Sequence, residues 1–194
     1  AQAIAPDLPT RLLMLVTSCR ETAHTTPAGW NLIGTQTSGG TGNSHTRISA
    51  YYIDIAASTT PTNPLSFVVA NTCMLFAQFK TQTDFDAATA PEFVSGAAAS
   101  GTTFDLGALA PSWGLASNDY TYAIAFPAET VGIVSAYPAS YTGGTQTFIT
   151  GALATEDGGF ALCHRQVRGT SEDPGAITWT GASVAAAMLI AVAP

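Results

Sequence analysis

Charged residues are scarce in this sequence. They make up 10% of 194 residues, with 6 Lys and Arg against 13 Asp and Glu, and Lys80 is the single lysine. Nucleic-acid binding needs a basic face that displaces counterions from phosphates, and a chain of net charge −7 without a basic cluster offers none. A weakly charged surface is also poorly protected against self-association. We therefore expect no nucleic-acid partner, and we favour a homo-oligomer or a lattice subunit over a plain monomer.

Cysteine is also scarce. Cys19, Cys73 and Cys163 are an odd number, widely spaced, and each lies within an apolar run. A disulfide framework favours an even number, so we expect reduced core cysteines in a protein folded in the cytoplasm. One disulfide with a spare thiol is the alternative.

Targeting and membrane segments are not evident. Residues 1–6 lack the basic and apolar regions of a signal peptide. The longest apolar run, residues 184–194, is too short to span a bilayer. We expect no membrane association.

The motifs of common enzyme classes are missing. There is no Gly-x-Ser-x-Gly elbow, and the loop at 39–42 (GGTG) has neither the third glycine of a dinucleotide motif nor the Lys-Ser/Thr ending of a phosphate loop. His24, His45 and His164 do not combine with the cysteines at the spacing of a structural zinc site. We expect no enzyme, no cofactor and no metal, although a Ser/His/Asp triad assembled from distant positions stays open.

Carboxylate pairs and exposed aromatic rings are the remaining candidates for chemistry. Asp84 and Asp86 could share a face and bind calcium, or act as the carboxylate pair of a glycosidase. Tyr137 and Tyr141 lie in the Pro-containing loop at 136–145 (AYPASYTGGT) and are the aromatic residues that we most expect to be exposed. Aromatic residues within strands are expected in the core. Tyr137 and Tyr141 are therefore the candidate contact or ligand residues.

What the sequence does contain is a series of short apolar runs separated by Gly, Pro, Thr, Ser and Asn, without a sustained helical period. This pattern predicts an all-β fold: a two-sheet antiparallel sandwich of jelly-roll-like winding, forming one domain over residues 1–194 with an N-terminal extension at 1–10. Residues 84–101 are predicted to be an irregular connection. Strands are predicted at 11–17, 29–34, 47–56, 65–70, 73–81, 102–106, 120–126, 145–150, 160–167, 177–179 and 184–192.

Two of these segments carry more specific expectations. Residues 120–126 place aromatic and branched side chains on one face and Thr and Ala on the other, where a second layer can approach closely. Residues 184–192 alternate in a way that favours a strand over a helix, and Gly181 predicts a bulge or a bend before them.

The order of motifs resembles a known group of proteins. A strand rich in Leu and Val is followed by Pro27-Ala28-Gly29-Trp30-Asn31-Leu32-Ile33-Gly34, a Gly-rich loop and an alternating strand, and the chain ends in an Ala-rich strand after Trp179-Thr180. This order resembles jelly-roll virion proteins of tailed bacteriophages of the capsid-decoration, head-fibre or tail-associated type. The resemblance implies a virion structural protein and brings no catalytic residues with it.

Within that group, the low charge and the absence of the repeats of a fibre shaft favour a capsid decoration or cement protein. Such a protein would be a homo-oligomer, with a trimer favoured, would attach to the major capsid protein, and would fold in the cytoplasm of the bacterial host before joining the virion. The alternative is a tail or spike component that binds host surface glycans through Tyr137 and Tyr141. A glycan hydrolase that uses Asp84 and Asp86 is a third hypothesis.

Overall fold

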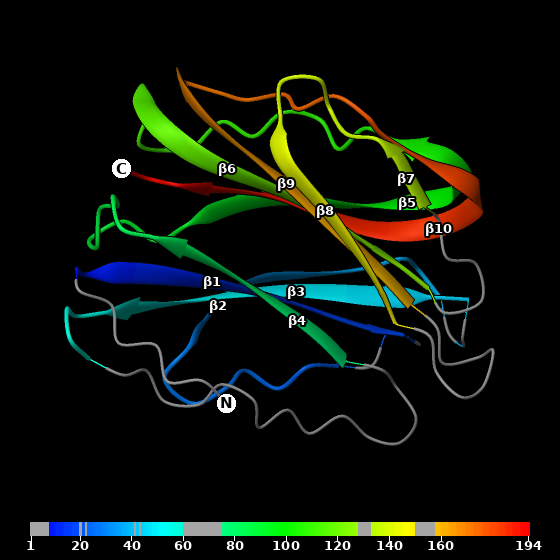
Figure 1. The fold of residues 1–194 in the computed structure, drawn as a ribbon, viewed down its shortest axis with the longest axis horizontal. Helices are drawn as coiled ribbons and strands as arrows, with labels where there is room; N and C mark the ends of the chain where they lie inside the picture. The colour runs from blue at the N-terminus through cyan, green and yellow to red at the C-terminus, as the bar shows by residue number, and fades with distance from the viewer. Residues whose placement is uncertain are drawn as a thin grey trace.

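The computed structural model describes residues 8–19, 21, 23–40, 42, 44–59, 75–127, 133–149 and 158–194. These residues form ten β-strands and no helix. Figure 1 shows two stacked layers of strands. The predicted all-β class and the antiparallel two-sheet sandwich are confirmed.

The first layer is a four-stranded sheet in the order β2-β3-β1-β4. Its central strand β1 is apolar on both faces, as predicted, with Met14 and Val16 on one side and Leu15 on the other. The strands are β1 (Thr10–Cys19), β2 (Asn31–Thr37), β3 (Thr46–Ile55) and β4 (Leu75–Gln82).

The second layer has six strands, in the order β5-β10-β6-β9-β8, and β7 also pairs with β10. Pairing is nested in both layers: β1 pairs with β4 and β2 with β3, and β5 pairs with β10 and β6 with β9. Nested antiparallel pairing is typical of Greek-key and jelly-roll chains, but here the first four strands complete one sheet before the other begins. The strands are β5 (Glu92–Phe104), β6 (Ala116–Phe126), β7 (Ile133–Ala136), β8 (Thr142–Ile149), β9 (Gly158–Gly169) and β10 (Ile177–Val192).

The two faces of β6 build two different cores, as the sequence predicts. Ala123 and Ala125 face the four-stranded sheet and pack in a cluster with Leu15 and Ile48. Tyr120 and the other large residues of β6 face the opposite side, in a cluster with residues of β5, β9 and β10. Small side chains at the layer contact let the sheets approach closely.

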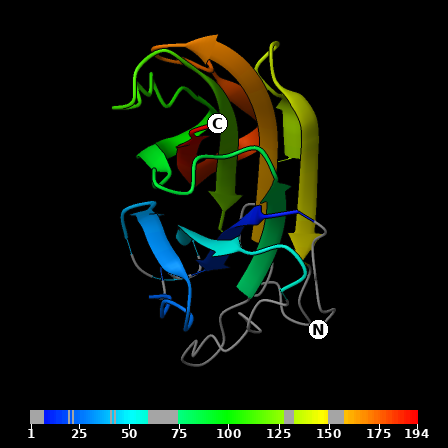
Figure 2. The same cartoon turned by 90° about the vertical axis from the view of Figure 1, so that its left-hand side faces the viewer.

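On one side of the sandwich the edge strands β2 and β5 meet (Figure 2). The ring of Phe93 occupies the space where a Cβ at position 34 would lie, so Gly34 allows this close approach. Ser95 Oγ donates to Gln36 Oε1 at 2.9 Å. The two sheets are therefore joined along this side by an aromatic contact and a polar contact.

Some predicted boundaries need correction. The irregular connection predicted at 84–101 is wrong beyond residue 91, because β5 begins at Glu92 and ends at Phe104, within the segment predicted as a separate strand at 102–106. The predicted strand at 65–70 lies outside the described residues, as do residues 1–7 of the N-terminal extension, and Thr10 already belongs to β1. The bulge predicted at Gly181 is confirmed: its φ is 76°, and the register of β10 against β5 shifts there.

Candidate functional site

A buried arginine lies at the centre of one polar network. Arg11 has no exposed surface. Arg11 Nε lies 2.6 Å from Asp54 Oδ1, and Arg11 Nη2 donates to Asp54 Oδ2 at 2.8 Å. The antiparallel register of β1 and β3 places the two residues directly opposite each other, so the sheet itself positions this bidentate pair.

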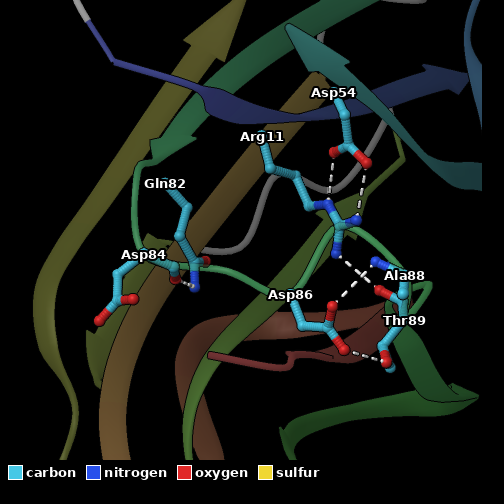
Figure 3. A network of polar contacts seen from close by, with 7 residues as sticks. All are labelled: Arg11, Asp54, Gln82, Asp84, Asp86, Ala88 and Thr89. Atoms are coloured by element: carbon cyan, nitrogen blue, oxygen red, sulfur yellow. Dashed lines mark hydrogen bonds and ion pairs between the residues drawn. The ribbon is translucent and has the colours of Figure 1, made fainter. Parts of the chain in front are cut away.

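The same guanidinium also holds the connection that leads from one sheet to the other. Arg11 Nη1 donates to the carbonyl oxygen of Thr89 at 2.9 Å. Its Cζ lies 4.9 Å from the ring centre of Tyr52 and 4.7 Å from that of Phe85. Figure 3 shows the guanidinium between Asp54 and the turn at Thr89. A cation placed over aromatic rings is stabilised by their quadrupoles, so the network fastens residues 83–91 to β1 and β3.

Asp86 stabilises the connection at residues 83–91 through hydrogen bonds to other residues of the same segment. Its Oδ1 accepts from the amide of Ala88 at 2.9 Å and its Oδ2 accepts from Thr89 Oγ1 at 2.6 Å. These hydrogen bonds lower the pKa of the Asp86 carboxyl. The Asp86 amide donates to the carbonyl of Ala193 at 3.1 Å, which fastens the connection to the C-terminal end of the chain.

The predicted pairing of Asp84 with Asp86 is not found. Figure 3 shows the two carboxylates pointing apart, and both oxygens of Asp86 are engaged in its own turn. Within the described ranges, no group of three or more His, Cys, Asp and Glu is placed to hold a metal ion. The structure therefore does not assemble the calcium site or the carboxylate pair considered for these residues.

The second network lies at the other end of β1 and β3. His24 sits between two serines, with Nε2 2.8 Å from Ser18 Oγ and Nδ1 2.8 Å from Ser49 Oγ. Ser49 Oγ donates to Thr35 Oγ1 at 3.1 Å, and Thr35 Oγ1 donates to the carbonyl of Ile48 at 3.2 Å. A neutral imidazole has one donor and one acceptor, so Nδ1–H donates to Ser49 and Nε2 accepts from Ser18.

This arrangement has the spacing of a serine–base pair but not its accessibility. Ser18 and Ser49 are each 1% exposed, so a substrate cannot reach either hydroxyl in this conformation. Burial, and secondarily the positive charge of Arg47, lowers the pKa of His24 to about 4. We interpret the cluster as a set of hydrogen bonds that holds the chain segment carrying His24 against β1, β2 and β3.

Glu21 extends the network to the Gly-rich loop. Its backbone is left-handed, with φ of 53°. Glu21 Oε1 accepts from the amides of Gly39 and Gly40 at 2.5 and 3.0 Å, and the carbonyl of Glu21 accepts from Arg47 Nε at 3.0 Å. A carboxylate of the β1–β2 connection therefore holds the first two glycines of the Gly-rich loop.

The two predicted contact residues lie largely within the fold. Tyr141 is 7% exposed and packs edge-on against Tyr122 at 6.3 Å between ring centres, so the predicted exposure of Tyr141 is wrong. Pro138 and the turn around it direct the ring inward, and the Tyr141 amide donates to the Pro138 carbonyl at 2.9 Å. Burial, followed by the nearby charge of Glu172, raises the pKa of Tyr141.

Tyr137 is half-buried, and its ring covers the position where a Cβ at Gly144 would lie. Burial, followed by the influence of Cys163, raises the pKa of Tyr137 to about 12. Cys163 is buried, as predicted, and is a free cysteine, whereas the side chains of Cys19 and Cys73 lie outside the described residues. A ligand-binding role for the two tyrosines stays a prediction.

An ion pair near these tyrosines was not predicted from the sequence. Arg165 Nη1 donates to Glu172 Oε1 at 2.6 Å and to Ser140 Oγ at 3.0 Å. The backbone of buried Glu172 exchanges two hydrogen bonds with Leu109, at 2.8 and 2.9 Å. The sequence places Glu172 near a proline in a turn-like segment, and nothing local signals that it is buried or that its partner, Arg165, lies seven residues earlier.

Comparison of the chain with protein-family models, with curated proteins and with solved structures gives no match. The resemblance to phage virion proteins therefore stays a prediction. Within the part of the chain that the structure describes, there is no helix long and apolar enough to cross a membrane.

Proposed function

We propose that this chain is a structural protein displayed on the surface of a bacteriophage-type particle, where it decorates and reinforces the capsid. The observation that carries the proposal is the character of the surface. Only 10% of the residues of the whole chain are charged, and several large apolar side chains are exposed to solvent. These side chains are Leu8 (60% exposed), Leu32 (50%), Leu115 (61%) and Ile133 (56%).

Such side chains are suited to burial against a neighbouring subunit. Removing apolar area from water contributes about 25 cal/mol per Å², and a stable attachment needs an interface of roughly 1,000 Å² or more. A surface with little charge costs little to desolvate, because few ions lose their hydration. Contact with capsid subunits, or with further copies of this chain, is therefore favoured.

The polar networks support a structural role in a different way. The charged and titratable groups of Arg11, Asp54, His24 and Glu21 are committed to holding strands and connections together. Hydrogen-bonded polar networks of this kind make a domain rigid. A rigid domain loses little conformational entropy on docking, which suits a protein that must reinforce a lattice.

The glycan-binding alternative rests on exposed rings of Tyr137 and Tyr141. Stacking on a sugar needs an open aromatic face, and Tyr141 offers almost none in this conformation. We therefore prefer decoration of the capsid to host recognition at a tail tip.

The location of the protein on the particle tests the proposal. An antibody raised against the purified chain is applied to particles from a lysed culture of the source strain, and the label is imaged by electron microscopy. Label spread over the head is the expected result. Label confined to the tail tip would contradict decoration and support the glycan-binding alternative.

A further inference from the structure

Residues 23–30, which we name the strap, lie across the outer face of the four-stranded sheet. Trp30 is buried at one end of the strap, in a cluster with Leu12, Met14 and Val16 of β1. Pro27, in the middle, is also buried. The strap therefore covers part of an apolar row that runs along the outer face of β1.

The other end of the strap is fastened by His24. Its two ring nitrogens reach hydroxyls on two different strands, Ser18 on β1 and Ser49 on β3, each at 2.8 Å. One imidazole thus connects the strap to the sheet through both of its polar atoms. In the neutral ring, one nitrogen accepts the proton of Ser18 and the other donates to Ser49.

We propose that the strap is an acid-sensitive cover: protonation of His24 releases its end from Ser18 and Ser49, and the strap leaves the apolar row on β1. A protonated ring has two donors and no acceptor, so the hydrogen bond from Ser18 is lost or reversed. The added charge also lies in a largely buried position beside Arg47. A cation buried between Ser18 and Ser49, each 1% exposed, and next to a second cation is costly, and this cost favours the released state, in which the imidazolium is hydrated.

Among the residues that the structure describes, the charged and titratable groups near His24 do not offset this charge. On β3 they are Arg47, which is cationic, and Tyr51, a neutral phenol packed in the same apolar cluster. On the connecting segments they are His45 and Glu21, and the Glu21 carboxylate is engaged with the amides of Gly39 and Gly40. Arg47 and burial act in the same direction on His24.

The sign of the pH effect follows from the lowered pKa. The ring takes up a proton with a pKa of about 4 in the fastened state and 6.5 in the released state. Fastening is therefore complete above about pH 6.5 and is lost as the pH falls toward 4. Proton linkage gives the change in the equilibrium constant between the released and the fastened strap. Relative to its value well above pH 6.5, the constant for fastening is about 30-fold lower at pH 5 and tends toward a value about 300-fold lower below pH 4.

Amide hydrogen exchange of the full chain, followed by NMR from pH 8 to pH 4.5, measures this release. The reporter is the amide of Trp30, which donates to the Pro27 carbonyl at 3.1 Å inside the strap. The reference is the amide of Ile124 in the centre of the six-stranded sheet. After correction for intrinsic exchange, we expect protection of Trp30 relative to Ile124 to fall by about 30-fold between pH 8 and pH 5.

Two variants separate the role of His24 from a general effect of acid. His24→Gln carries no titratable ring, so its Trp30 protection should be independent of pH whatever its absolute level. His45→Gln removes a histidine of the neighbouring loop and should keep the wild-type pH dependence. The proposal is overturned if His24→Gln retains that dependence, or if Trp30 protection in the wild type does not change with pH.

A direct titration keeps the test decisive if His24→Gln does not fold. The ring signals of His24 in the wild type should titrate together with the loss of Trp30 protection. A His24 ring that titrates near pH 6.5 while the strap stays protected would show that the charge is accommodated in place, which contradicts the proposal.

Discussion

At the scale of single residues, Arg11 and Asp54 form an ion pair whose two side chains differ in their exposure to solvent. The guanidinium is fully buried, whereas the Asp54 side chain is 31% exposed. Removal of either partner leaves the other one without this counter-charge, but only the carboxylate can then be hydrated. Substitution of Asp54 and substitution of Arg11 should therefore lower the free energy of unfolding by different amounts.

We predict that Asp54→Ala lowers the free energy of unfolding by about 3–5 kcal/mol, because a buried cation is left without its counter-ion. Arg11→Met keeps the volume of the side chain and should cost less, about 1–2 kcal/mol. Urea unfolding measures both values. The double variant should be no less stable than Asp54→Ala alone, and a loss equal to the sum of the two would show that the residues do not act as a pair.

Tyr141 gives a second prediction at this scale. Its hydroxyl is buried and has no hydrogen-bond partner among the described residues, whereas the hydroxyl of Tyr122 donates to the Phe104 carbonyl at 3.3 Å. A buried polar group without a partner is destabilising. Tyr141→Phe should therefore leave thermal stability unchanged or raise it by up to about 1 kcal/mol, and Tyr122→Phe should lower it by about 1 kcal/mol. Marked destabilisation by Tyr141→Phe would mean that the hydroxyl has a bound partner, such as an ordered water.

At the scale of elements, β10 is the strand that organises the six-stranded sheet, since it pairs with β5, β6 and β7. It reaches all three because it bends at Gly181, where φ is 76° and the pairing register shifts. That backbone conformation is readily adopted by glycine, and a Cβ there would meet no other atom within 4 Å. A side chain at this position would therefore lower stability only through the left-handed backbone conformation that the residue must adopt.

We predict that Gly181→Ala lowers stability by about 1–2 kcal/mol through left-handed strain alone. Gly101→Ala in β5 is the matched control, since Gly101 does not have a positive φ and a Cβ there would make only ordinary contacts, the nearest at 3.6 Å. The control should be neutral or slightly stabilising, because alanine restricts the unfolded chain. Equal losses in the two variants would argue against a required bend.

Elements with alternating side chains were predictable from the sequence, and elements built from small residues were not. β6 alternates between large and small side chains, so its strand and both of its faces follow from the pattern. Much of β5 is Gly, Ala and Ser, which carries no hydrophobic period. It forms a strand because the Ala-rich part of β10 lies beside it, with Ala186 opposite Ala97 and Ala187 opposite Gly96.

The candidate sites were less predictable because their members are far apart along the chain. Arg11 lies in a run that reads as an apolar central strand, and its partner Asp54 is 43 residues away. His24 reaches serines 6 and 25 residues away in sequence. Both networks depend on the register between β1 and β3, which a single sequence without that register does not reveal. The turn that directs Tyr141 inward is likewise a tertiary effect.

At the scale of the whole molecule, we propose a rigid sandwich whose weakly charged, partly apolar surface is covered by neighbouring subunits on a particle. Attachment of this kind depends on apolar burial more than on ion pairs. It should therefore persist at high salt, because screening weakens surface charge interactions and leaves the hydrophobic contribution in place.

The most direct test of this account is the thermal stability of particles with and without the protein. Particles that lack it are heated in low salt, and release of their DNA is followed with an intercalating dye, before and after purified protein is added back. The account predicts release at a lower temperature from the deficient particles, restoration by the wild-type protein, and weaker restoration by Leu115→Asp or Ile133→Asp. Deficient particles that withstand heat as well as complete ones would contradict the proposed reinforcing role.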